Sequence, residues 1–164
     1  MTLLQTLEWL ETTALGAVAR ESLYGFQILV AVHLLGLVSS VGVLLWVDLR
    51  LMGIALRRYS LSAVYRGLAP WFSAGFIVML ASGAALFSGF ATAAYGNVFF
   101  RVKIAAMLLA GVNAAVYHFV TQRASAGWDD APLPPWQARS AGAFSLLLWV
   151  LVILCGRMMS YTLF

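Results

Sequence analysis

Residues 24–47 read YGFQILVAVHLLGLVSSVGVLLWV, an apolar stretch with no Asp, Glu, Lys or Arg and with one titratable residue of intermediate pKa, His33. A transmembrane helix needs roughly 20 consecutive, mostly apolar residues, because that length crosses the hydrocarbon core of a bilayer. The stretch is long enough and apolar enough to do so. It therefore predicts that this chain is a membrane protein.

Three further stretches meet the same criterion or nearly meet it, over residues 70–90, 98–122 and 140–161. The turn-forming sequence Tyr95-Gly96-Asn97 separates the second stretch from the third. In all, 63% of the 164 residues are hydrophobic and 10% are charged, which is more apolar surface than one soluble domain can bury. We expect an all-α membrane protein, a four-transmembrane-helix bundle forming a single membrane domain over residues 1–164.

The first 20 residues carry apolar side chains at spacings of three and four, at Leu3, Leu7, Leu10, Ala14 and Val18. This pattern is typical of a helix that lies in the membrane interface, so we expect an N-terminal amphipathic interfacial helix over residues 2–20. Glu8 and Glu11 interrupt what would be the apolar core of a signal peptide. We therefore expect the segment to be retained.

Basic residues divide unequally between the two ends of the expected bundle. One end receives Arg50, Arg57, Arg58, Arg66, Arg123 and Arg139, and the other receives Arg20, Arg101, Lys103 and Arg157. The positive-inside rule then places the 48–69 loop in the cytoplasm and both termini on the opposite side. The net charge of +4 is explained by this topology, without a dense basic cluster for nucleic acid. Asp48, at the inner end of the first span, is expected to pair with a nearby arginine.

The two histidines, His33 and His118, both lie within apolar runs, where an ionisable group is a candidate functional residue. Two imidazoles on facing helices commonly hold haem iron. Depth argues against that pairing, because His33 lies about 14 Å below the outer boundary and His118 about 22 to 28 Å below it. Helix tilt does not comfortably absorb such a mismatch. We interpret His118 as a hydrogen-bonded residue of the inner boundary, with a ligand role as the alternative.

The outer halves of the third and fourth spans offer partners for His33. Lys103 and Met107 lie one turn apart, and Arg157 lies at the same level. Haem iron accepts imidazole together with thioether and more rarely amine, and cationic side chains suit the propionates. We therefore expect haem b with His33 as axial ligand, Lys103 or Met107 as the opposite contact or a propionate partner, and Arg101 and Arg157 near the propionates. The alternative is that the three basic residues extend to the headgroups and that His33 is a hydrogen-bonded core residue.

A copper site would use some of the same atoms. Cys155 and Met158 are three residues apart on one helix face, where Met107 and His33 could approach them. Soft sulfur donors suit Cu(I). The chain has no Cys-x-x-Cys, Met-x-x-x-Met or histidine-rich tract, so copper handling ranks below haem.

Small residues are frequent in three of the expected spans, at Gly36, Ser39, Ser40, Gly42, Ser82, Gly83, Ala110, Gly111 and Ala114. Such residues let helix backbones approach closely, and they also leave room for a flat cofactor.

Four segments of the chain resemble a family of uncharacterised small bacterial four-helix membrane proteins: Val32-His33-Leu34-Leu35-Gly36-Leu37, Asp48-Leu49-Arg50-Leu51-Met52-Gly53, Leu68-Ala69-Pro70-Trp71 and Asn97-Val98-Phe99-Phe100-Arg101-Val102-Lys103. The resemblance implies a bacterial inner (cytoplasmic) membrane protein, with periplasmic termini if the topology above holds. A looser likeness runs to HemJ-type protoporphyrinogen oxidases and to the membrane domain of copper resistance protein D. It rests on His33, Lys103 and Tyr117-His118. It implies haem contacts at His33 and Lys103.

The sequence contains no Gly-rich phosphate loop, no paired intramembrane carboxylates and no Ser/His/Asp set that would indicate an enzyme. We expect a haem-binding electron-transfer module or subunit rather than a stand-alone enzyme. Its expected partners are the lipid bilayer, a quinone or a periplasmic redox protein, and other membrane subunits or further copies of the chain. The alternative is a non-catalytic structural or assembly subunit, and copper handling is the third reading.

Overall fold

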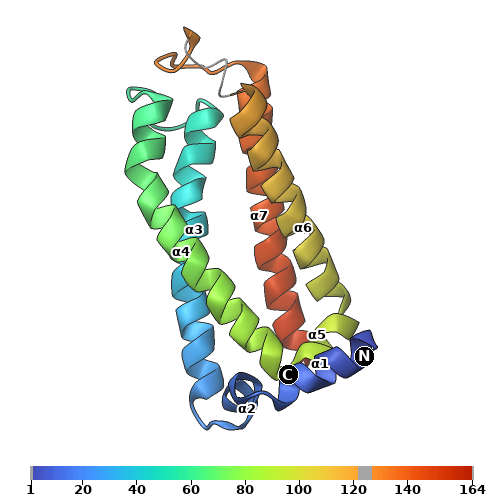
Figure 1. Ribbon diagram of the computed structural model, residues 1–164. Helices are drawn as coiled ribbons and strands as arrows, with labels where there is room; N and C mark the ends of the chain where they lie inside the picture. Colours follow the sequence, from blue (N-terminus) through green and yellow to red (C-terminus); the bar gives the residue numbers. More distant parts are fainter. Residues whose placement is uncertain (1, 122–126, 164) are drawn as a thin grey trace.

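The computed structural model describes residues 2–121 and 127–163, and within them every regular element is a helix. Four helices are long and apolar enough to cross a membrane: α3 (Gly25–Leu51), α4 (Leu61–Gly89), α6 (Val98–Val116, continued by the π-helix η1, Tyr117–Thr121) and α7 (Trp136–Leu163). They run side by side along one long axis (Figure 1). This confirms the predicted membrane bundle. The expected end of the third span at residue 122, and Arg123 beyond it, lie outside the described residues.

The two chain termini lie at one end of the bundle, together with α1 (Leu3–Thr12), α2 (Ala14–Glu21) and α5 (Ala91–Gly96) (Figure 1). We call this the terminal end. The connection from α3 to α4 and residues 127–135, which precede α7, lie at the opposite end, which we call the loop end. Each membrane-spanning helix thus runs from one of these ends to the other.

The helices pack as two pairs, α3 with α4 and α6 with α7. Small residues bring the first pair close, as the sequence suggested: a Cβ on Gly36 would lie 2.7 Å from the backbone nitrogen of Met79, and one on Gly75 would lie 2.7 Å from the Cβ of Ser39. The buried hydroxyl of Ser40 donates to the Gly36 carbonyl at 2.7 Å. Gly36 and Gly75 therefore act as contact residues of this helix pair.

The two pairs meet mainly through α3 and α7. Among the described residues the α4 and α6 backbones stay farther apart and meet through side chains, as where the Phe87 and Phe100 rings stack with their centres 5.3 Å apart. Side chains fill the middle of the bundle, where a buried cluster forms from Met79, Ala106, Ala110, Leu148, Trp149 and Val152. We call this the central cluster. On either side of it the separation of α4 from α6 leaves space for a cavity.

The second span begins at Leu61 rather than at Pro70, and the first continues to Leu51, so the predicted 48–69 loop shortens to residues 52–60. Ser60 caps α4, because its hydroxyl accepts from the backbone N–H of Ala63 at 3.3 Å. Pro70 lies inside the helix. A proline is tolerated there because neighbouring groups of a membrane bundle can satisfy the freed carbonyl.

The predicted single helix over residues 2–20 is divided in two at Thr13. The Thr13 backbone is extended, and its hydroxyl accepts from the N–H of Gly16 at 3.2 Å, so it caps α2. Of the expected apolar face, Leu7 is buried while Leu3 and Val18 are more than half exposed. A continuous amphipathic helix is therefore not what the structure has, and a position in the membrane interface stays a prediction.

Candidate functional site

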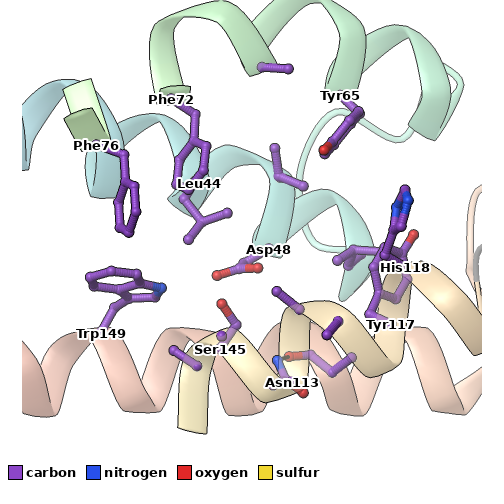
Figure 2. Close-up of a pocket in the computed structure, with 18 of the residues that line it drawn as sticks. Leu44, Asp48, Tyr65, Phe72, Phe76, Asn113, Tyr117, His118, Ser145 and Trp149 are labelled. Carbon is purple, nitrogen blue, oxygen red and sulfur yellow. Dashed lines mark hydrogen bonds between the residues drawn. The ribbon is translucent and has the colours of Figure 1, made fainter. Parts of the chain in front are cut away.

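Two cavities lie between the helix pairs, one toward each end of the bundle. The cavity toward the terminal end has a volume of about 590 Å³ and is lined from α3, α4, α5, α6 and α7. The cavity toward the loop end has a volume of about 410 Å³ (Figure 2). We call them the His33 cavity and the Asp48 cavity. Met107 lines both, so they adjoin at the level of the central cluster.

His33 lies on α3 with its ring held from α4. Its Nδ1 lies 2.9 Å from the backbone oxygen of Met79 and 3.1 Å from the hydroxyl oxygen of Ser82. A carbonyl oxygen only accepts, so Nδ1 carries the proton and donates it. The Nε2 lone pair is then left available, and no hydrogen bond reaches Nε2 from the part of the chain that the structure describes. This is the arrangement that orients a histidine as a metal ligand.

Two glycines of the neighbouring helices lie next to the polar side chains of this cavity. A Cβ on Gly83 would lie 3.1 Å from Cε1 of His33, and one on Gly156 would lie 3.6 Å from Nζ of Lys103. The ring therefore lies over α4 at Gly83, and the ammonium lies over α7 at Gly156. At Gly83 a Cβ would be in tight contact with the ring, whereas at Gly156 it would be in ordinary van der Waals contact with the ammonium.

The structure brings four of the predicted site residues to one cavity: His33, Lys103, Met107 and Arg157 all line it. The guanidinium of Arg157 donates to the Tyr161 hydroxyl at 3.1 Å and lies 4.6 Å from the centre of that ring. No Asp or Glu occurs among the described residues that line this cavity. Its ionisable groups are thus bases, which suits a ligand with carboxylates.

Four other predicted residues lie elsewhere. Arg101 is exposed, and its Nε donates to the Tyr95 carbonyl at 2.9 Å, so it does not line the His33 cavity. Cys155 is buried and Met158 is 44% exposed, and neither belongs to the lining. His118 lines the Asp48 cavity instead. The two histidines therefore face different cavities.

Asp48 is buried at 3% exposure, and Ser145 on α7 is its hydrogen-bond partner. The expected arginine pairing is not found within residues 2–121 and 127–163, where both ion pairs involve Arg20. Residues two apart on a helix point in different directions, so Arg50 does not face Asp48.

Arg50 is fully buried and donates to backbone carbonyls of the loop end, those of Tyr59 at 2.9 Å, Asp129 at 3.3 Å and Ala131 at 3.0 Å.

The Asp48 cavity is a site that the sequence reasoning missed. Figure 2 shows the Asp48 and Ser145 side chains pointing toward each other, with the aromatic rings of Phe72, Phe76 and Trp149 on one side. Tyr117 also lines the cavity, and its hydroxyl is buried without a hydrogen-bond partner among the described residues. The available signal was Ser145 and Asn113, polar residues within otherwise apolar runs of the third and fourth spans.

The model of a family described as "Family of unknown function (DUF6644)" matches residues 6–162. No curated protein and no solved structure matches the chain. The likeness to HemJ-type oxidases and to copper resistance protein D stays a prediction.

Proposed function

The chain belongs to the DUF6644 family of unknown function, and from its own geometry we propose that it is a membrane protein that binds haem b and transfers electrons. The observation that supports the proposal best is the hydrogen bonding of the His33 ring. Its Nδ1–H is committed to the Met79 carbonyl at 2.9 Å, and its Nε2 is left toward a cavity lined by four membrane-spanning helices. An imidazole held in this way is ready to ligate haem iron.

The other groups of the His33 cavity fit the remaining parts of a haem. Lys103 and Arg157 are cations that would suit the two propionates, and the Met107 thioether would be a second ligand of the iron. Lys103 would be the alternative ligand. The cavity volume of about 590 Å³ lies within the range of roughly 300–1,000 Å³ that is usual for sites of small molecules and cofactors.

The protein residues have three tasks in this function. Met79 and Ser82 hold the His33 ring in one orientation, the cationic side chains bind carboxylates, and apolar residues such as Phe26 and Phe87 exclude water. Haem, when bound, supplies one-electron redox chemistry. Excluding water lowers the local dielectric and strengthens the interactions between these charges.

Localisation and partners follow from the same proposal. The loop end holds Arg50, Arg57, Arg58, Arg66 and Arg139, so the positive-inside rule puts that end in the cytoplasm of a bacterium. The His33 cavity is then nearer the periplasmic side of the inner membrane. Electrons would be exchanged with a quinone or with a periplasmic redox protein.

An absorption spectrum of the purified protein, expressed with haem supplied, tests the proposal. The wild type should show a Soret band, and His33→Ala should lose it. His118→Ala is the matched control, because it removes the other histidine, from the other cavity, and should keep the band. Gel filtration establishes that each variant is folded. A wild-type protein without a Soret band, or an unchanged band in His33→Ala, rules the proposal out.

A further inference from the structure

The Asp48 cavity has no part in haem binding, yet it contains a buried carboxyl group in a membrane-spanning helix. It is lined from α4 and from α6, whose backbones are not closely packed within the described residues and whose Phe87 and Phe100 rings stack beside the other cavity. Lining residues on both sides of this gap are exposed, Tyr65 at 45% and Phe119 at 59%. A molecule dissolved in the lipid can therefore reach the cavity sideways, without crossing water.

The lining separates into an apolar part and a small polar part. Aromatic and aliphatic side chains make up most of it, including Phe72, Phe76 and Trp149. The polar part contains Asp48 with its partner Ser145, and the buried Tyr117 hydroxyl that has no hydrogen-bond partner among the described residues. An unsatisfied buried hydroxyl is costly, so a ligand oxygen that accepts from it would be favourable.

These features define the chemistry of the ligand. It enters from the bilayer, it places a ring between aromatic side chains, and it presents oxygen atoms to a hydroxyl and a carboxyl group. No Lys or Arg occurs among the described residues that line the cavity, so a phosphate or carboxylate ligand would have no such counter-charge. A ring with ketone or hydroxyl oxygens on an apolar tail meets every condition.

We propose that the Asp48 cavity binds the head group of a lipid-soluble quinone and that Asp48 exchanges a proton with one of its oxygens. The electron-transfer part of this inference rests on the proposed haem function, and the binding part does not. Because Met107 lines both cavities, only the central cluster separates the quinone from the His33 cavity.

Quinone would take up two electrons, which haem would supply one at a time when bound, and two protons to give quinol. Asp48 provides one proton: its O–H bond breaks as the quinol O–H bond forms, and the carboxylate left behind keeps its hydrogen bond from Ser145. Water from the loop end provides the second proton and reprotonates Asp48. Oxidation of quinol follows the same steps in reverse.

Binding is tested by titrating decylubiquinone into the detergent-solubilised protein and measuring the heat released. Gly111 lines the cavity, and a Cβ there would meet nothing within 4 Å, so Gly111→Phe should fold and fill the space. It should weaken binding at least tenfold. Gly67→Phe makes the same chemical change at an equally open position outside both cavities, and should change affinity less than twofold. Equal decylubiquinone affinities of the two variants would show that quinone does not bind in the Asp48 cavity.

Proton exchange is tested with Asp48→Asn, which keeps the size of the side chain. The rate at which decylubiquinol reduces the haem should fall at least 100-fold, since general acid–base catalysis typically contributes 10²–10⁴-fold. Quinone affinity should stay within threefold, which also shows that the variant is folded. An unchanged reduction rate would overturn the role of Asp48.

The two proposals can fail separately. Quinone binding is measured in His33→Ala as well, where it should persist. If the wild type binds quinone but has no Soret band, the haem proposal fails and the quinone site stands. If the Soret band is present and quinone does not bind, the quinone site fails alone. Binding of tetraphenylphosphonium that Asp48→Asn removes, with no quinone binding, would identify an organic cation site and overturn the inference.

Discussion

The two ends of the bundle contain the same kinds of feature with opposite charges. At the terminal end the cavity is basic, with His33, Lys103 and Arg157, while an acidic residue, Glu11, anchors the helices outside it. At the loop end the cavity contains the carboxyl of Asp48, while the basic Arg50 anchors the loops. At each end, one ionisable side chain forms hydrogen bonds with backbone groups, and other ionisable side chains line the cavity.

The ionisable residues that hold the fold together differ from the candidate site residues in their hydrogen-bond partners. Arg50 and Glu11 both have hydrogen bonds to backbone groups of distant segments, at Tyr59, Asp129 and Ala131 for the first and at Thr92 for the second. Such groups hold the fold together. His33 instead keeps one nitrogen free toward a cavity, and Asp48 faces a cavity with a hydroxyl as its partner. A ligand is the natural partner for groups left in that state.

The largest effect is expected from Arg50→Lys. This change keeps the positive charge and hence the topology, but an ammonium cannot present the donor fork of a guanidinium to three carbonyls. We expect the free energy of unfolding to fall by about 2 to 4 kcal/mol, because hydrogen bonds from a charged group contribute about 1.5 to 3 kcal/mol. Denaturation in mixed detergent micelles measures it. Arg58→Lys, at an exposed position, is the control and should stay within about 0.5 kcal/mol of wild type. An equal decrease in the free energy of unfolding of both variants would show that Arg50 does not anchor the loops.

The next effect distinguishes the two basic residues at the start of α6. Lys103 lines the His33 cavity and Arg101 does not. Lys103→Met should weaken haem binding about tenfold, or about 1.4 kcal/mol, through the loss of a charged contact. Arg101→Met, the matched control, should weaken it less than twofold. Titration of haem into each purified variant, followed at the Soret band, gives the affinities, and a reversed order would contradict this view of the cavity.

The smallest effect concerns pH and the anchor at Glu11. Burial alone would raise the pKa of Glu11, but hydrogen bonds from Thr92 and the charge of Arg20 together outweigh it and hold the pKa below the usual 4.5. The group therefore stabilises the fold above about pH 4.5, and this contribution is lost as the pH falls through the folded-state pKa. Glu11→Gln should cost about 1 kcal/mol at pH 7 and less under acid conditions. Glu8→Gln, at an exposed position of α1, is the control and should stay within about 0.5 kcal/mol of wild type at pH 7 when both are unfolded in detergent.

Much of the molecule follows from local patterns in the sequence. The apolar runs predict four spanning helices, because length and hydropathy alone decide whether a segment can cross a bilayer. Helix rise along the same runs puts His33 and His118 at different depths, and they line different cavities. It also puts Lys103, Met107 and Arg157 at the level of His33, and all four line one cavity.

The errors came where contacts between segments override local pattern. Arg101 is near Lys103 in sequence, yet it folds back on the Tyr95 carbonyl. The helix break at Thr13 depends on a cap that apolar spacing does not reveal, and the early start of α4 depends on another at Ser60. Asp48 was expected to meet an arginine, but the arginine nearest in sequence donates to three carbonyls of the loop end.

The sequence by itself determined that four helices span a membrane and at what depth each polar residue lies, because both depend only on hydropathy and on rise along a helix axis. Only the tertiary structure decided which way those residues face. That depends on how the helices rotate and pair: Gly36 and Gly75 bring α3 against α4, while the α4 and α6 backbones are not closely packed and leave the two cavities between them. Rotation about a helix axis is set by contacts with its neighbours, and such contacts are not written in any single helix.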